Sequence, residues 1–425
     1  MEKKRSDSFR NALHQANLSS RFFDKILELA VGYCGENLIE TFKSKKRLRE
    51  RYLAEKWDGV DVEPDLNVFR EVDYDYLITL IRSNLVDSSN QLYNSHFELV
   101  DVCLRFGEYN KAEGLIGYLW SNFDFEDPKR LSDNYMLEAK LSFLKNNLED
   151  SENFYIKSLD SYKSINDHIG LIKSYNNLGI ISYERKWDTE KGKKYFRNAK
   201  KLCEETQKDV DKDIVISVQM NLAIIDDIQG YSERAYELFN ELFNSVDETD
   251  TSTLYRIAIN RGFAAKNYGD LDLAFESLAN LFFNNKEPSN HRLTGIASLL
   301  IAEIYVRKEL FSKAKNYLIQ AFKTFSKLHD RLSIADTYRV FGMLYREERK
   351  YELAESQFQI SLELNDEYGN LLNLSETHYE FSLLFKQQGD TYSQREHLDQ
   401  AISYAREMGA NKRVERLQEE RQALG

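Results

Sequence analysis

The sequence predicts an all-α protein built from repeated helical hairpins, and three observations lead to this prediction. The chain has 425 residues, more than one compact core normally requires. It contains only three prolines and 18 glycines, whereas an all-β fold of this length would need many more turn residues. A small residue also recurs about every 40 positions. We therefore expect an elongated array of helices.

The recurring small residue lies in segments such as NNLGIISY and RVFGMLYR, at intervals of 39, 40, 44, 39, 40, 40 and 40 residues. Most units have a second small residue twelve positions on and a large apolar residue sixteen positions on. Two antiparallel helices approach closely only where side chains are small, so each unit predicts one hairpin. The recurring positions are Val100, Ala139, Gly179, Ala223, Gly262, Ala302, Gly342 and Ser382.

Some units depart from this pattern. In the third unit the second small residue, Gly192, lies thirteen positions on, which predicts one extra residue in the turn. Residues 206–213 lengthen the next connection, and solenoids tolerate such insertions on an outer face. Glu138 and Arg261 replace large apolar residues, and Gln394 replaces a small one. We expect local differences in packing at these positions within an otherwise regular array.

The pattern resembles the tetratricopeptide (TPR) consensus, which has a large residue before Gly or Ala, an aromatic three on, Ala twelve on and an aromatic or Leu sixteen on. Residues 335–361 and 295–321 match it closely. The period of about 40 is similar to the repeats of kinesin light chains, LGN-type adaptors and Rap/NprR-type bacterial peptide receptors. The resemblance covers about residues 92–410 and implies a right-handed superhelix of about eight hairpins.

The remaining segments predict the domain organisation. Residues 1–56 lie outside the period and carry 13 Lys/Arg against 8 Asp/Glu, which indicates a basic helical module. A linker is expected over 57–71, a leading helix over 72–91, the repeats over 92–410 and a C-terminal capping helix over 411–425. Because solenoid repeats contact only their neighbours, we expect the module 1–56 to be separable from the array.

The sequence contains none of the common catalytic or nucleotide-binding motifs. Its three cysteines and seven histidines lack the spacing of a metal site, so we expect no cofactor, no metal and no enzyme activity. The charged N-terminus and the lack of an apolar run of about 18 residues argue against secretion and membrane insertion. We therefore expect a cytoplasmic protein.

A candidate peptide-binding surface follows from the resemblance, which implies that the first helix of each hairpin lines a concave groove. TPR proteins often hold extended peptides through an Asn two residues before the small position, and three consecutive units carry Asn177, Asn221 and Asn260 there. An amide both donates and accepts hydrogen bonds, so these residues can pair with a peptide backbone. The alternative is that each amide bonds to a neighbouring hairpin. Apolar residues expected on the same surface are Ile180, Tyr183, Met220, Ile224 and Phe263.

The first helices of later units also place basic residues at groove positions. These side chains suit acidic groups or a C-terminal carboxylate of a ligand. The alternative is that several point to the convex face or pair with local Glu residues. The positions are Arg256, Lys266, Arg307, Arg339 and Arg346.

These features favour a scaffold that binds a protein or peptide ligand and does not contact membranes. The alternative is an intracellular peptide-sensing regulator of the Rap/NprR type, whose N-terminal module contacts DNA or a signalling protein. Nucleic acid would be contacted only through that module, although its basic run from Lys43 to Arg51 is more typical of a solvated helix. A third interpretation is a partner of an enzyme encoded elsewhere. The irregular N-terminal module also favours homodimerisation through one end.

Overall fold

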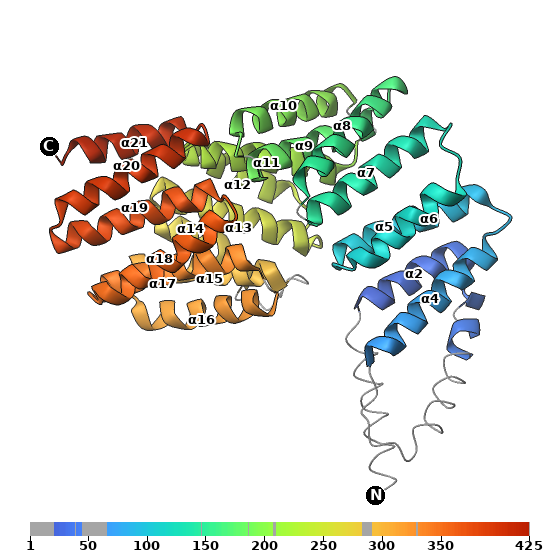
Figure 1. Ribbon diagram of the computed structural model, residues 1–425, viewed down its shortest axis with the longest axis horizontal. Coiled ribbons are helices and arrows are strands. Elements are labelled where there is room, and N and C mark those ends of the chain that lie inside the picture. The colour runs from blue at the N-terminus through green and yellow to red at the C-terminus, as the bar shows by residue number, and fades with distance from the viewer. Residues whose placement is uncertain are drawn as a thin grey trace, which may run out of the picture. The chain divides into compact units, whose positions relative to one another are not determined.

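The structure is a computed structural model that describes residues 21–38, 40–44, 66–145, 147–185, 187–206, 210–282, 291–328 and 330–424 (Figure 1). Within these ranges every regular element is a helix, so the predicted all-α class is confirmed. No helix in these ranges is long and apolar enough to span a bilayer. Most of the predicted linker and of the basic run before it lies outside the described residues. The chain divides into two compact units, residues 1–170 and 171–425.

The first unit contains two of the predicted hairpins, α5–α6 and α7–α8, preceded by the helices α2 and α4. The leading helix begins earlier than predicted, at Leu66, and ends at Asn84. The helices are α2 (Arg21–Cys34), α4 (Leu66–Asn84), α5 (Ser89–Arg105), α6 (Tyr109–Asn122), α7 (Pro128–Leu144) and α8 (Leu148–Ser164).

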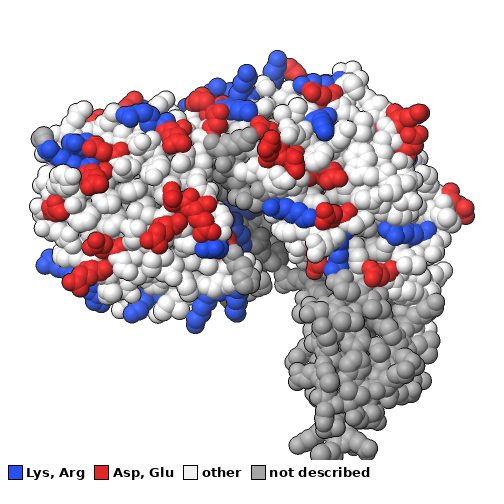
Figure 2. Space-filling view, viewed as in Figure 1, with Lys and Arg blue, Asp and Glu red and all other residues white. Residues whose placement is uncertain are grey.

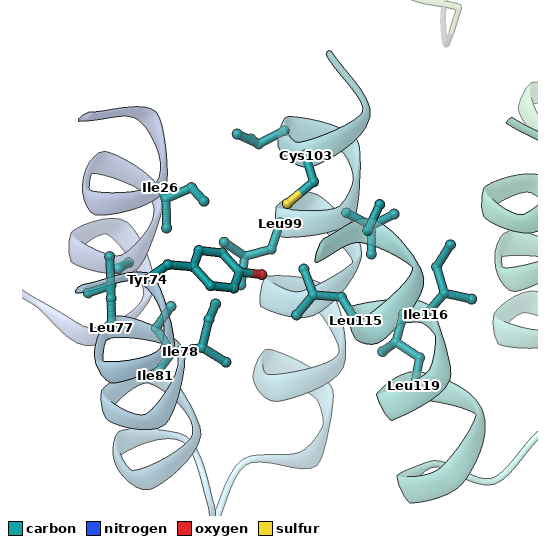
Figure 3. Close-up of a cluster of buried hydrophobic side chains, with 14 of the residues drawn as sticks. Ile26, Tyr74, Leu77, Ile78, Ile81, Leu99, Cys103, Leu115, Ile116 and Leu119 are labelled. Carbon is teal, nitrogen blue, oxygen red and sulfur yellow. The ribbon is translucent and has the colours of Figure 1, made fainter. Parts of the chain in front are cut away.

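One hydrophobic core joins α2, α4, α5 and α6. Ile26 of α2, Leu77 of α4 and Leu99 of α5 are fully buried in it, and the ring of Tyr74 points among them toward Cys103 (Figure 3). Burial raises the pKa of the Cys103 thiol to about 12. Since α2 lies within the predicted module 1–56, this shared core argues against the expectation that the module is separable.

The second unit contains six further hairpins and ends with a single helix. First helices of the hairpins alternate along the chain with second helices, as the repeat predicts. The elements are α9 (His168–Ile180), α10 (Thr189–Thr206), α11 (Lys212–Ile228), α12 (Ser232–Ser245), α13 (Thr251–Tyr268), α14 (Leu271–Phe282), α15 (His291–Arg307), α16 (Phe311–Lys327), α17 (Arg331–Glu347), α18 (Tyr351–Glu367), α19 (Leu371–Gln388), α20 (Thr391–Glu407) and α21 (Asn411–Gln422).

The recurring small residues mark the places where the two helices of a hairpin approach most closely. All eight are buried, and each lies on the first helix of its hairpin. A Cβ added to Gly342 would lie 2.5 Å from the ring of Phe358, the large residue sixteen positions on. A Cβ added to Gly179 would likewise lie 2.5 Å from the ring of Phe196, which is seventeen positions on because of the extra residue in this unit. The hairpin geometry predicted from the spacing is therefore confirmed.

The irregular turn predicted in the third unit has a clear structural form. Helix α9 continues into a π-helical turn, η1 (Ile181–Arg185), and Trp187 then adopts a left-handed backbone with φ of 54°. A π-turn accommodates one residue more than an α-turn. This turn therefore absorbs the extra residue before Gly192 without disturbing the packing of the hairpin.

The second unit closes on itself, because its first and last hairpins are in contact (Figure 1). The Thr189 hydroxyl at the start of α10 donates a 2.7 Å hydrogen bond to the backbone oxygen of Met408, between α20 and α21. Phe196 of α10 and Leu417 of α21 belong to one buried cluster. The predicted capping helix α21 therefore packs against the beginning of the unit as well as against α20.

Candidate functional site

The inner wall of the second unit encloses a polar cavity of about 350 Å³. Each first helix from α11 to α19, and α21, contributes at least one charged residue to its lining, and six of these residues follow one another from helix to helix. These six residues, which we call the charge ring, are Asp227, Lys266, Glu303, Arg339, Glu376 and Arg413.

Ion pairs connect five members of the charge ring in chain order. Lys266 Nζ lies 3.1 Å from Glu303 Oε1, and Arg339 Nη2 lies 3.8 Å from Glu303 Oε2. Arg339 Nη2 also lies 3.3 Å from Glu376 Oε2, whose other oxygen lies 3.1 Å from Arg413 Nη1. Positive and negative groups therefore alternate from α13 to α21. Because every contact joins successive first helices or α21, the network also fastens the hairpins to one another.

The pKa values of the carboxyl groups reflect this alternation. Burial alone would raise the pKa of Glu303, but Lys266, Arg339 and Arg307 hold it well below its usual range. Glu376 is affected in the same way, and its pKa falls to about 2. Burial raises the pKa of Asp227, despite the opposing fields of Arg413 and Lys266. The Asp227 carboxylate accepts hydrogen bonds from the Ser232 hydroxyl and the Asn267 amide, and it lines the same cavity as the two cations.

A second set of ion pairs surrounds Glu380. Arg346 Nη1 lies 2.7 Å from Glu380 Oε2, and Arg307 Nη2 lies 3.3 Å from its Oε1. Arg307 also contacts Glu303 at 3.1 Å and remains 39% exposed in its side chain. Four of the five predicted groove cations are thus paired with protein carboxylates, as the alternative interpretation of these residues held.

The fifth predicted cation differs. Arg256 is exposed on α13 and forms no ion pair within the described ranges. The surrounding protein lowers the pKa of its guanidinium, and the nearby Tyr183 and Asp250 partly offset this effect. Arg256 is therefore the predicted cation that is most accessible to a ligand.

The three predicted amides do not form a uniform ladder. Asn221 is only 4% exposed, and its Nδ2 donates a 2.9 Å hydrogen bond to Oδ1 of Asn176, a residue not singled out in the sequence. Asn260 donates at 2.9 Å to the backbone oxygen of Arg256 in its own helix. Asn177 is partly buried on α9. Asn221 and Asn260 therefore form hydrogen bonds within the protein. A role of the three amides in ligand binding stays a prediction.

The predicted apolar residues divide in a similar way. Met220 and Tyr183 are buried members of the core. Ile180 and Ile224 are partly buried and pack against the cluster that joins the first and last hairpins. Phe263 is partly buried, with Lys266 Nζ 5.3 Å from its ring centroid. Several of these side chains therefore stabilise the closed unit.

The carboxylates of the charge ring were missed in the sequence, although a signal for them exists. Along the chain, Lys266, Glu303, Arg339, Glu376 and Arg413 follow one another at intervals of 37, 36, 37 and 37 residues. Each interval is about one helical turn shorter than the repeat of about 40 residues, and the ion pairs join side chains at this offset on successive first helices and α21. Opposite charges at this interval therefore predict the ion pairs.

Replacing Asn221 with Ala is expected to lower the free energy of unfolding by about 1–3 kcal/mol, because the buried amide of Asn176 loses its partner. Asn260→Ala is the matched control, since within the described ranges its amide bonds to the backbone oxygen of Arg256 in its own helix. Denaturant unfolding of both variants measures the difference. Equal stability of the two variants would contradict the structural role of Asn221.

Comparisons with known proteins bear on the fold. No family model and no curated protein matches the sequence. The structure is similar to that of a Rap protein complexed with Competence and Sporulation Factor, with a TM-score of 0.58 and 13% identity over 94% of this chain and 100% of that one. The fold is that of a TPR-like solenoid. The predicted resemblance to the Rap group is confirmed at this level.

Two further structures support the same conclusion. The Rap conjugation gene regulator of the plasmid pLS20, in complex with the Phr* peptide, has a TM-score of 0.54 and 16% identity over 94% of this chain and 98% of that one. The apo form of RapI has a TM-score of 0.51 and 14% identity over 65% of this chain and 98% of that one. At such identities the similarity shows the fold alone.

Proposed function

We propose that the second unit binds a peptide or a segment of a partner protein, with one charged end of the ligand in the cavity. The observation that carries this proposal is the charge-lined cavity on the inner wall of a TPR-like solenoid. Its volume of about 350 Å³ is at the lower end of the range for small-molecule pockets, about 300–1,000 Å³. The cavity therefore suits a chain end or a charged side chain better than a whole extended peptide.

The groups available to such a ligand lie beside the charge ring, whose own members are largely paired. Arg416 of α21 is exposed and forms no ion pair in the described part of the chain, and its guanidinium lies 5.8 Å from the ring centroid of Tyr379. Glu420 accepts a 3.1 Å hydrogen bond from the Tyr379 hydroxyl. A ligand carboxylate would therefore bind Arg416, while Glu420 would bind an amino group.

A second candidate function is a peptide-sensing intracellular regulator of the Rap/NprR type. Two structures with a similar fold are complexes with Competence and Sporulation Factor and with the Phr* peptide, and each similarity covers 94% of this chain. In this function the N-terminal module would contact DNA or a signalling protein, and the ligand would control that contact. We propose the cytoplasm as its compartment, and free thiols at Cys34, Cys103 and Cys203 suit a reducing environment.

The proposed peptide binding can be tested with a randomised library of short peptides that carry free carboxyl ends. We expect the full-length protein to enrich a subset of peptides. Arg416→Ala should weaken their binding about tenfold, because a charge-assisted hydrogen bond contributes about 1.5–3 kcal/mol. Arg421→Ala is the control, since Arg421 on the same helix pairs with Asp399, 2.9 Å away, and does not line the cavity. Failure to enrich any peptide, or equal weakening in both variants, would exclude this site.

A further inference from the structure

A second surface of the same unit carries an unusual concentration of positive charge. The chain has a net charge of −12, yet residues 190–201 contain six Lys/Arg and one Asp/Glu. These residues lie on α10, and Figure 2 shows Lys and Arg side chains gathered along the upper edge of the molecule over this helix. A region of positive charge on an otherwise acidic protein attracts negatively charged partners.

The charges on α10 form a stripe along one face of the helix. Lys191, Lys194, Arg197 and Lys201 are separated by three or four residues, which places them on the same side, and all four are exposed. Lys194 and Arg197 form no ion pair within the described ranges. Lys201 approaches the exposed Glu205 at 3.6 Å, and a contact of this kind contributes little. Lys194 and Arg197, at the centre of the stripe, are therefore available to a partner.

A cavity of about 260 Å³ lies beside the stripe and exists because the unit is closed. Three segments far apart in the sequence form it: the first turns of α10, the turn between α11 and α12, and the turn between α20 and α21. Its lining residues are Glu190, Lys193, Arg197, Gln229, Tyr231, Arg234, Gly409 and Asn411.

The charges around this cavity do not balance. Lys193 Nζ and Arg234 Nη2 both contact Asp226, at 2.8 and 2.6 Å, so one carboxylate offsets two cations. Arg197 has no such partner in the described ranges. Glu190, the acidic residue of the lining, accepts a 2.7 Å hydrogen bond from Gln229. The cavity therefore retains a positive surplus that favours a carboxylate.

We propose that this surface, which we call the α10 surface, binds an acidic segment of a partner protein. It consists of the stripe Lys191, Lys194, Arg197 and Lys201 together with the adjoining cavity. One carboxylate of the segment enters the cavity, and further carboxylates lie along the stripe. The α10 surface is distinct from the cavity on the inner wall, so it provides a second site on the same unit.

The surroundings of the α10 surface favour a protein segment over nucleic acid. The second helix of the next hairpin, α12, exposes Glu233, Glu237 and Glu241, with no ion pair to these residues in the described ranges. A nucleic acid carries closely spaced phosphates along its whole length and would be repelled by them and by the net charge. An acidic protein segment carries a few carboxylates at separate positions, and it can match a short stripe.

The proposal can be tested by the fluorescence anisotropy of a labelled Glu-rich peptide about 12 residues long. We expect the full-length protein to bind it, with affinity falling steeply between about 50 and about 300 mM salt. Lys194→Glu combined with Arg197→Glu should weaken binding at least about tenfold. The control combines Lys315→Glu with Lys323→Glu on α16, which makes the same change in charge at exposed positions. It should alter the affinity less than about twofold, and thermal unfolding confirms that both variants fold.

Three outcomes would overturn the proposal. The first is equal weakening by the two charge reversals, which would show that only net charge matters. The second is loss of binding in Arg416→Ala but not in the α10 variant, which would place the peptide in the inner cavity. The third is tighter binding of a single-stranded DNA of similar length through Lys194 and Arg197. None of these results decides whether the inner cavity binds other peptides, so the two proposals fail independently.

Discussion

Replacing Glu303 with Gln is expected to lower the free energy of unfolding by about 3–5 kcal/mol, since it breaks a buried ion pair from one side. The Glu303 side chain is 2% exposed and contacts Lys266, Arg307 and Arg339. Gln cannot neutralise these cations, and Lys266 would keep a buried ammonium without an ion pair in the described ranges. The loss corresponds to a fall in melting temperature of about 10 °C.

Differential scanning calorimetry of Glu303→Gln and of a control variant measures this effect. Glu355→Gln on α18 is a suitable control, because Glu355 is exposed and forms no ion pair in the described part of the chain. It should leave the melting temperature within about 1 °C of the original. Equal melting temperatures of the two variants would show that the charge ring does not stabilise the fold.

The same variant should change the dependence of stability on pH. Because its native pKa is lowered, Glu303 binds fewer protons in the native state than in the unfolded state, whose pKa is about 4.3. Its stabilising effect is therefore present above about pH 4.3 and decreases as the pH falls toward the native pKa. The stability difference between the original protein and Glu303→Gln should narrow from about pH 7 to about pH 3. Denaturant unfolding at both pH values measures it, and a constant difference would contradict the ion-pair explanation.

Deleting residues 411–425 is expected to open the second unit and to destabilise it by at least about 3 kcal/mol. The deletion removes the buried side chain of Leu417 and the Arg413–Glu376 ion pair. It also removes the wall that α21 contributes to the inner cavity. Hydrogen exchange should become faster in the turn between α11 and α12, which α21 contacts. Unchanged exchange there would mean that α21 does not hold the closure.

A pair of glycine variants distinguishes two contributions to stability, the contact that closes the second unit and the strain of a left-handed backbone. Gly230 and Gly389 both have positive φ, 95° and 77°, so replacement by Ala adds the same left-handed strain of about 1–2 kcal/mol. A Cβ at Gly230 would also lie 2.9 Å from Cβ of Lys412 in α21, whereas a Cβ at Gly389 meets nothing within 4 Å. Gly230→Ala should therefore destabilise the protein more than Gly389→Ala. The excess measures the cost of the steric clash that the added Cβ makes with α21.

The hairpins could be predicted from the sequence because their geometry depends on local contacts. The spacing of Gly342 and Phe358 places both residues at the crossing point of one hairpin, where the structure has them in contact. The closure could not be predicted in this way. It depends on the total rotation that six successive hairpins accumulate. The spacing of residues in the sequence does not give this total rotation. Thr189 and Met408 therefore gave no sign of their contact.

The candidate site shows a similar division. Lys266, Arg307 and Arg339, which the sequence placed at groove positions, line the cavity, and their role in ligand binding stays a prediction. Their pairing was missed because the cations were considered without the carboxylates 36 or 37 positions away. Glu303 and Glu376 lie at that distance and neutralise much of the predicted positive surface. The position of a residue within the repeat therefore predicts whether its side chain faces inward. Predicting the charge of the inner surface also requires the residues on the neighbouring helices.

The closure also constrains how such a chain can fold and evolve. In an open array a hairpin can be added or lost at little cost, because each one touches only its neighbours. Here the hydrogen bond from Thr189 to Met408 joins residues 219 positions apart. Such distant contacts form late and slowly, and they bind the hairpins between them into one cooperative folding unit. Gain or loss of a single repeat would displace α21 from its contact, so the number of hairpins in this unit is fixed by its geometry.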